Sequence, residues 1–235
     1  LLHPHRVIIG TNRKKSNKTM NALYMPIVKK TSRYYNTSRR GAELIKYASN
    51  AFLATKITYI NELANLCEKT GVDIKDISVG MGSDERIGER FLRAGPAYGG
   101  SCFPKDTRAL INTANQFKTD LSIVKSVVKS NNKRKILLTK RLENILNNKL
   151  KNKVITFLGV TFKPNTDDIR EASSIKMIKY LNKNNSKIRY HDPSGEKNEF
   201  KKLKNVKYYK DISSACFNCD SVSYTHLRAH ETESN

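Results

Sequence analysis

The sequence lacks any apolar run that approaches the roughly 18 to 20 residues a membrane-spanning helix needs. Residues 1–6 (LLHPHR) also form neither the apolar core nor the small-residue cleavage site of a secretory signal peptide. We therefore expect neither a secreted nor a membrane protein, and the predicted location is the cytoplasm.

Cysteine, proline and glycine are scarce as well. The chain has four cysteines, at positions 67, 102, 216 and 219, and without a secretory signal this predicts free thiols in a reducing compartment. Six prolines and eleven glycines exclude a collagen-like chain, and 38% hydrophobic with 28% charged residues is typical of a soluble globular protein. The 235 residues are enough for one to two domains with buried cores.

Acidic residues are outnumbered, with 21 Asp and Glu against 44 Lys and Arg, which gives a net charge of +23. Such an excess has two explanations. It indicates an anionic partner, such as nucleic acid or a phosphorylated small molecule, or it reflects a bias in composition. The lysines are spread along the chain, which favours a bias in composition over an anionic partner as the explanation of the charge. A nucleic-acid-binding protein would need basic residues gathered on one face with aromatic platforms, and the sequence shows neither an RNP-like aromatic set nor a recognition helix.

The first two thirds of the chain are predicted to be mainly helical. A strand is expected at 6–10, a helix at 17–30 and a polar linker at 31–40. Apolar residues then recur every three or four positions from 41 to 70, which predicts one long helix that ends at Gly71. Shorter helices within 72–95, a Gly/Pro-rich turn at 95–104 and helices at 104–117 and 121–148 are expected to follow.

The pattern changes at Lys153, after which strands and helices alternate. Strands are expected at 154–158, 187–191 and 206–209, and helices at 173–182 and 195–203, as in a Rossmann-like βαβ unit with a parallel sheet. The predicted fold class is therefore α/β, with a central all-helical domain at 41–150 followed by the Rossmann-like domain at 151–222. Residues 1–40 and 223–235 remain outside these two domains.

The segment 95–106 carries the most chemical information. Gly99 and Gly100 permit torsions barred to other residues, and Pro104 suits the first turn of a helix, so Cys102 is predicted at or just before a helix N-terminus. The N–H groups there and the nearby Lys105 favour a thiolate, and Asp106 could orient a water molecule. From these residues alone, an activated nucleophile and a small buried cysteine beside a helix cap remain equally open.

Residues 99–106 resemble the cysteine motif of the UDP-glucose/GDP-mannose dehydrogenase family. Four further stretches resemble parts of that family in the same order: AELIKYASNAF at 42–52, DERIG at 84–88 followed by FL at 91–92, GVTFKPNTDDIRE at 159–171, and HDP at 191–193. Within the family, the sequences of these motifs are most similar to those of members that act on UDP-glucose.

The resemblance implies an oxidation of the C6 alcohol of UDP-glucose by NAD, through an aldehyde, to the carboxylate of UDP-glucuronate. Cys102 would trap the aldehyde as a thiohemiacetal and then carry a thioester that water cleaves. Lys46 and Asn50, four residues apart on one helix face, would stabilise the oxyanion, and Asp106 would assist the water or hold Lys46. GDP-mannose and UDP-N-acetylmannosamine are the alternative substrates.

The resemblance also assigns residues to the substrate, the cofactor and a second subunit. Arg86 would reach the substrate of a neighbouring subunit, which implies a homodimer through the central helices. Lys163 would contact the phosphates or the sugar. The residues implied to bind substrate are Lys46, Asn50, Arg86, Phe91, Leu92, Arg93, Gly95, Tyr98, Gly99 and Lys163, with backbone N–H groups near Gly95 and Gly99, and those near NAD are Cys102, Lys105 and Arg170.

Two parts of the sequence depart from the family pattern. Nothing matches the glycine fingerprint G-x-G-x-x-G of a dinucleotide-binding domain, so residues 1–40 are expected to be the remnant of such a domain and the chain a fragment. A fragment of this kind could be inactive alone, or could only dimerise. Residues 223–235 are polar and read as foreign sequence joined to a truncated domain.

The cysteines near the end of the chain raise the question of a metal site. Cys216-x-x-Cys219 and His226-x-x-x-His230 have the pair spacings of a zinc site. The loop between the pairs is too short for a zinc finger, and no metal is expected.

Overall fold

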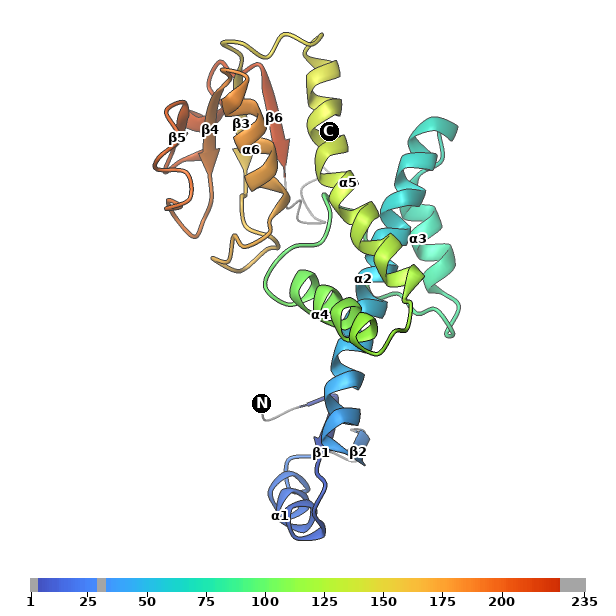
Figure 1. Ribbon diagram of the computed structural model, residues 1–235. Coiled ribbons are helices and arrows are strands. Elements are labelled where there is room, and N and C mark those ends of the chain that lie inside the picture. The colour runs from blue at the N-terminus through green and yellow to red at the C-terminus, as the bar shows by residue number, and fades with distance from the viewer. Residues whose placement is uncertain (1–3, 29–32, 225–235) are drawn as a thin grey trace.

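The computed structural model describes residues 4–28 and 33–224. Its elements form three groups along the chain: a small strand pair at the N-terminal end, a set of long helices, and a four-stranded sheet (Figure 1). The predicted α/β class, with a helical part followed by a parallel sheet, is confirmed. None of the helices within the described residues combines the length and apolar character needed to cross a membrane.

The N-terminal group is a small βαβ unit. Strand β1 (Arg6–Gly10) is followed by helix α1 (Lys14–Tyr24) and by strand β2 (Arg33–Thr37), which pairs in parallel with β1. The predicted strand is confirmed, but the helix begins and ends earlier than expected. The prediction of a linker at 31–40 is wrong for 33–37, because the backbone there completes a ladder with β1, and Tyr34, Tyr35 and Thr37 are residues that favour strands.

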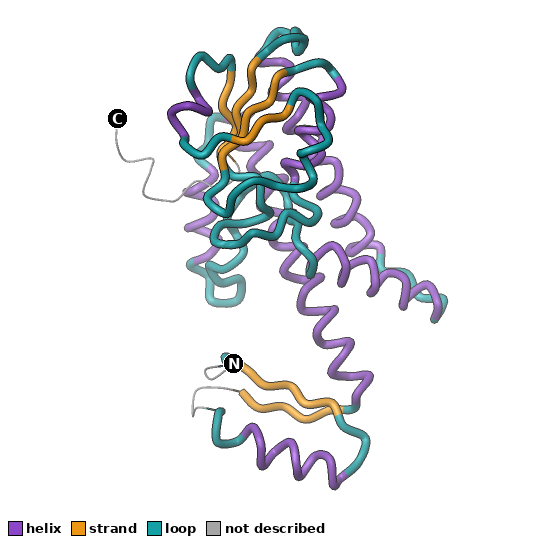
Figure 2. Tube along the Cα trace, turned by 90° about the vertical axis from the view of Figure 1, so that its left-hand side faces the viewer, coloured by secondary structure: helices purple, strands orange, loops and turns teal. Residues whose placement is uncertain are grey.

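One helix runs out from this strand pair into the centre of the molecule. Helix α2 (Arg39–Thr70) has 32 residues and is about 48 Å long (Figure 2). The Ser38 side chain accepts a hydrogen bond from the Gly41 N–H at its start, and Gly71 ends it with a φ of 72°, as the sequence predicts.

Three further helices pack on or beside α2. Helix α3 (Ile74–Gly82) is capped by the Asp73 side chain, and α4 (Phe103–Gln116) lies against α2. Helix α5 (Ser122–Ile145) contacts α2 and α4 and then continues to the sheet (Figure 1). Only α3 forms within 72–95, and residues 83–102 are turns and irregular backbone that return the chain from α3 to α4.

The sheet is fully parallel, with the strand order β5-β4-β3-β6. Its strands are β3 (Val154–Leu158), β4 (Lys187–His191), β5 (Val206–Tyr208) and β6 (Ser221–Tyr224), with α6 (Ser173–Lys183) and α7 (Ile212–Cys216) between them. Strand β6 pairs with β3 as far as Leu158↔Tyr224, so the sheet extends two residues beyond the expected domain end at 222.

The largest hydrophobic core lies between this sheet and the helices α5 and α6. Ile155 and Phe157 of β3 and Ile178 and Leu181 of α6 are completely buried in it. Burial of each such side chain contributes about 1.5–3 kcal/mol to the stability of the fold, so this core stabilises the packing of the helices on the sheet.

The helix expected at 195–203 is wrong. Gly195 has a φ of +89°, and the buried Asp192 accepts hydrogen bonds from the backbone and hydroxyl of Ser194. This turn and the following ones replace the helix, and the Lys197 side chain folds inward onto Ser194.

Candidate active site

Cys102 occupies the N-cap position of α4, with Pro104 in the first helical turn. Its thiol is free and exposed, and its side chain caps no backbone N–H. The predicted position of the cysteine at a helix N-terminus is confirmed. The alternative that Cys102 is a small buried cysteine beside a helix cap is wrong, because the residue is exposed. The sulfur is therefore open to a ligand.

A buried carboxylate lies one helical turn after the cysteine. Asp106 is completely buried, and its Oδ2 accepts hydrogen bonds from Lys46 Nζ and Asn50 Nδ2 of α2, both at 2.6 Å, while its Oδ1 accepts one from Lys105 Nζ at 2.5 Å. Burial raises the pKa of this carboxyl, but the hydrogen bonds from Lys105, Lys46 and Asn50 outweigh it and lower the pKa below its usual value. Asp106 is therefore an anion at neutral pH that joins α2 to α4.

Two cations lie within electrostatic reach of Cys102. The pKa of Lys105 is raised, first by its hydrogen bond to Asp106 and to a smaller extent by the charge of a Cys102 thiolate. The pKa of Arg170 is raised in the same way, first by its hydrogen bond to Asp168 and then by that thiolate. The structure thus brings Lys46, Asn50 and Lys105 together on Asp106, one helical turn after the cysteine, and places the Arg170 backbone against Gly100, two residues before it.

The loop before the cysteine is held by three buried polar side chains that the sequence did not reveal. Asn61 Oδ1 accepts the Gly95 N–H at 2.8 Å, and Asn131 forms two hydrogen bonds with the backbone of Tyr98. Arg134 donates to Gly95 O at 2.6 Å, and also to Asn61 O and to Asn65 Oδ1. Burial lowers the pKa of Arg134 to about 10, which leaves it charged at neutral pH.

These anchors correct one expectation. The Gly95 N–H was expected to serve the substrate, but Asn61 already accepts its hydrogen bond. Asn131 and Arg134 lie three residues apart on one face of α5, and this spacing is the sequence signal that points to the anchors.

The same loop touches the sheet part of the molecule backbone to backbone. A methyl group on Gly99 would lie 2.7 Å from Glu171 O, and one on Gly100, whose φ is +77°, would collide with the Phe162 ring. The Gly100 N–H donates to Arg170 O at 2.7 Å, and Ser173 Oγ donates to Pro96 O at 2.7 Å. Glycine is therefore required at both positions.

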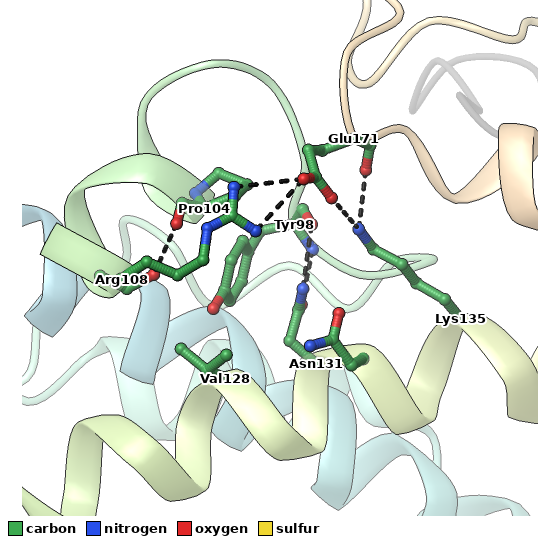
Figure 3. A pocket seen from close by; sticks show the side chains of 9 residues that line it. Tyr98, Pro104, Arg108, Val128, Asn131, Lys135 and Glu171 are labelled. Carbon is green, nitrogen blue, oxygen red and sulfur yellow. Dashed lines mark hydrogen bonds and ion pairs between the residues drawn. The ribbon is translucent and has the colours of Figure 1, made fainter. Parts of the chain in front are cut away.

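Glu171 is the centre of a second charged cluster beside this contact (Figure 3). Its carboxylate accepts hydrogen bonds from Arg108 of α4 and lies 3.6 Å from Lys135 Nζ of α5, and its backbone oxygen accepts from the same Lys135 at 2.7 Å. Lys135 is almost completely buried, and burial lowers its pKa while Glu171 opposes the shift. The pocket among these side chains has a volume of about 10 Å³, enough for one water molecule.

The remaining residues implied for substrate differ in exposure. Leu92 and Tyr98 are buried, and burial raises the pKa of the Tyr98 hydroxyl. Phe91 is exposed, and its ring packs edge-on against Phe103, the residue after the cysteine. The other exposed ones are Arg86, bound to Asp84 at 2.6 Å, Arg93, and Lys163, whose Nζ lies 5.5 Å from the Phe162 ring centre.

No group of three or more potential metal ligands occurs in residues 4–28 and 33–224. Cys216 and Cys219 lie in this range, but His226 and His230 fall outside the described residues. The zinc spacing noted in the sequence therefore has only its cysteine half in the structure.

Sequence models of the UDP-glucose/GDP-mannose dehydrogenase family match two parts of the chain. The family's central domain matches residues 40–133, and its UDP binding domain matches residues 156–228. The second match includes residues 223–228, which were expected to be foreign sequence.

Known relatives agree with both matches. The chain is 42% identical over 223 residues to a UDP-glucose 6-dehydrogenase of Rickettsia felis, which covers 94% of this chain and 50% of the relative. It is 45% identical over 221 residues to a UDP-glucose 6-dehydrogenase of Bacillus subtilis, with 94% of this chain and 49% of the relative covered. The chain thus spans about half the length of these curated relatives.

A solved structure supports the same assignment. The structure of a UDP-glucose dehydrogenase from Pyrobaculum islandicum superimposes with a TM-score of 0.90 at 31% sequence identity, over 96% of this chain and 52% of that one. The motifs, the fold and these similarities agree, and the chain belongs to the UDP-glucose/GDP-mannose dehydrogenase family.

Proposed function

We propose that this chain carries the thiol and the sugar-nucleotide site of an NAD-dependent oxidoreductase that converts UDP-glucose to UDP-glucuronate. The observation that carries the proposal is the exposed Cys102 at the start of α4, next to donors that Asp106 holds in place. The UDP binding domain matched at 156–228 and the UDP-glucose 6-dehydrogenases among the relatives support the choice of substrate.

The donors around Asp106 suit the oxyanion of such a reaction. Lys46 has three N–H groups and Asn50 two, and each uses one on Asp106, so both keep hydrogens for a ligand. The Cys102 sulfur adds to the C6 aldehyde, and these donors stabilise the charge that develops on its oxygen. The thiohemiacetal is oxidised to a thioester, which water then cleaves.

Two oxidations are needed, of the C6 alcohol to the aldehyde and of the thiohemiacetal to the thioester. Each requires a hydride acceptor, which NAD supplies when bound, so one turnover uses two equivalents of NAD. The exposed Lys105 and Arg170, both within the field of Cys102, fit the anionic part of a dinucleotide. Lys105 donates a hydrogen bond to Asp106, and Arg170 donates one to Asp168. The position of each cation is therefore fixed before a ligand binds.

The reactivity of the four thiols tests the proposal. With iodoacetamide at neutral pH, Cys102 is expected to react fastest because it is exposed, whereas Cys67 is buried. UDP-glucose at about ten times its Kd is expected to slow the Cys102 reaction to about a tenth. Peptide mapping by mass spectrometry measures both rates, and Cys102→Ser is the control for the assignment of the label.

Equal reactivity of all four cysteines, or a Cys102 rate that UDP-glucose does not change, would contradict the proposal. Parallel titrations with GDP-mannose and UDP-N-acetylmannosamine decide among the substrates of the family. The nucleotide sugar that protects Cys102 at the lowest concentration is the preferred one.

We also propose that α2 pairs with α2 of a second copy of this chain. Phe52, Tyr59 and Leu66 are 67%, 51% and 56% exposed, and their spacing of seven residues places them on one face of the helix. Such a face is commonly buried in a symmetric dimer. The exposed Arg86, fixed to Asp84, is then available to reach the substrate of the partner.

Phe52→Asp is expected to convert a dimer into a monomer, because it replaces the most exposed apolar side chain of this face by a charge. Light scattering coupled to size-exclusion chromatography gives the mass directly. Ile145→Asp, at the far end of α5 and 73% exposed in the native chain, is expected to leave the mass unchanged. A monomeric native chain, or a Phe52→Asp variant that stays dimeric, would rule out this interface.

A further inference from the structure

Two cysteines that the proposed reaction does not use lie at the two ends of one tight turn. Cys216 is the last residue of α7, and the Cys219 N–H donates to Cys216 O at 3.2 Å. Between them, Phe217 has φ −58° and ψ 121°, and Asn218 has φ 49°, close to the torsions of a type II β-turn. Such a turn brings its first and fourth Cα atoms within about 7 Å, and disulfides span about 4.4–6.8 Å.

The backbone on both sides of the turn is fixed to the sheet. Thr156 Oγ1 of β3 donates to Ala215 O at 2.7 Å, and Arg189 Nη1 of β4 donates to Phe217 O at 2.5 Å. After the turn, Asp220 forms two hydrogen bonds with the backbone of Val154. The turn therefore cannot open without loss of contacts to two strands, and it keeps the two cysteines near each other.

The two thiols are free and partly exposed, so small molecules can reach them. Partial burial is the main reason that the pKa of Cys216 is raised, and the nearby Cys219 thiolate raises it further. This second cause agrees with the short separation that the turn imposes on the two residues. Phe217, at the tip of the turn, is 70% exposed and leaves one side of the turn open.

We propose that Cys216 and Cys219 form a dithiol site that small disulfides such as glutathione disulfide convert into an intramolecular disulfide. The Cys219 thiolate attacks one sulfur of glutathione disulfide and releases one glutathione thiolate. The Cys216 thiol then loses its proton and attacks Cys219 in the mixed disulfide, which releases the second glutathione. The protein loses two protons and two electrons, and one glutathione disulfide becomes two glutathiones.

The experiment uses the full chain, reduced and then incubated with glutathione disulfide, quenched with N-ethylmaleimide and mapped by mass spectrometry. The expected result is a peptide that contains both cysteines, is two hydrogens lighter, carries no maleimide and regains both thiols with dithiothreitol. Cys216→Ser is expected to stop at a glutathione adduct on Cys219. A mixed disulfide between glutathione and Cys102 can form independently, and it does not change the result expected for the 216–219 peptide.

Phenylarsine oxide provides a second test, because its arsenic binds two neighbouring thiols at once. The native chain is expected to retain it on the 216–219 peptide against a monothiol wash, and Cys216→Ser and Cys219→Ser are each expected to lose it. Stable glutathione adducts on both cysteines of the native chain, a disulfide to Cys67 or Cys102, or equal arsenical retention by the single variants would overturn the proposal.

Discussion

Replacement of Arg134 by methionine is expected to lower the free energy of unfolding by about 3 kcal/mol. The guanidinium is buried and holds Gly95 O, Asn61 O and Asn65 Oδ1. Methionine fills much of the volume but removes the donor to Gly95 O, whereas Asn65 Oδ1 keeps its hydrogen bond from Arg141. Part of the loss is offset because the substitution also removes a buried charge. That this charge is unfavourable follows from the pKa of Arg134, which is lowered mainly by burial.

Urea denaturation followed by circular dichroism measures this loss. Arg141→Met is the matched control, because Arg141 lies two turns later on the same helix and binds Glu68 and Asn65 from a more exposed position. Its expected cost is below about 1 kcal/mol. Equal costs for the two variants would show that the contact of Arg134 with the loop at 95–100 does not stabilise the fold.

Asp106→Asn is expected to cost about 2 kcal/mol at pH 7, because a buried anion with three donors becomes a neutral amide. The cost should depend on pH. The pKa of Asp106 is lower in the folded chain than in the unfolded one, since its hydrogen bonds outweigh burial. The stabilisation is therefore complete above the unfolded pKa of about 3.8 and disappears as the pH falls through the lower folded value.

The comparison that isolates this effect is the difference in unfolding free energy between the native chain and Asp106→Asn, measured at pH 7 and again near pH 3. We expect the difference to shrink at the acidic end. Asp120→Asn, which breaks only an exposed ion pair with Lys125, is expected to change stability little at either pH. A difference that is the same at both pH values would contradict the role of Asp106 as an anion.

Local signals in the sequence predict local features of this chain well. The apolar period of α2 and the glycine after it predict one long helix that ends at Gly71. The apolar run at 154–158 predicts the buried strand β3, and Gly-Gly followed by Cys102 and Pro104 predicts the cysteine at the N-terminus of α4. Each of these features depends on residues within a few positions of one another.

The features that the sequence does not reveal depend on distant partners. Strand β2 forms because β1 lies beside it, and its strand-favouring Tyr34, Tyr35 and Thr37 stand in an otherwise polar segment. Arg134 and Lys135 stand among many polar residues in α5, but the loops at 95–100 and 162–173 cover them and supply carbonyl oxygens. Glu171 has a φ of +56°, which no local pattern predicts for a glutamate.

The close approach of Gly99 to Glu171 has a mechanical consequence for the proposed reaction. Main chain meets main chain at Gly99 and Glu171, and the Phe162 ring fills the space beside Gly100, so the contact leaves little room to absorb a displacement. Under the proposed function, a nucleotide that displaced the 162–173 segment would also displace the loop that carries Cys102, because the Gly100 N–H is bound to Arg170 O. The strength with which the nucleotide is held and the placement of the thiol would then vary together.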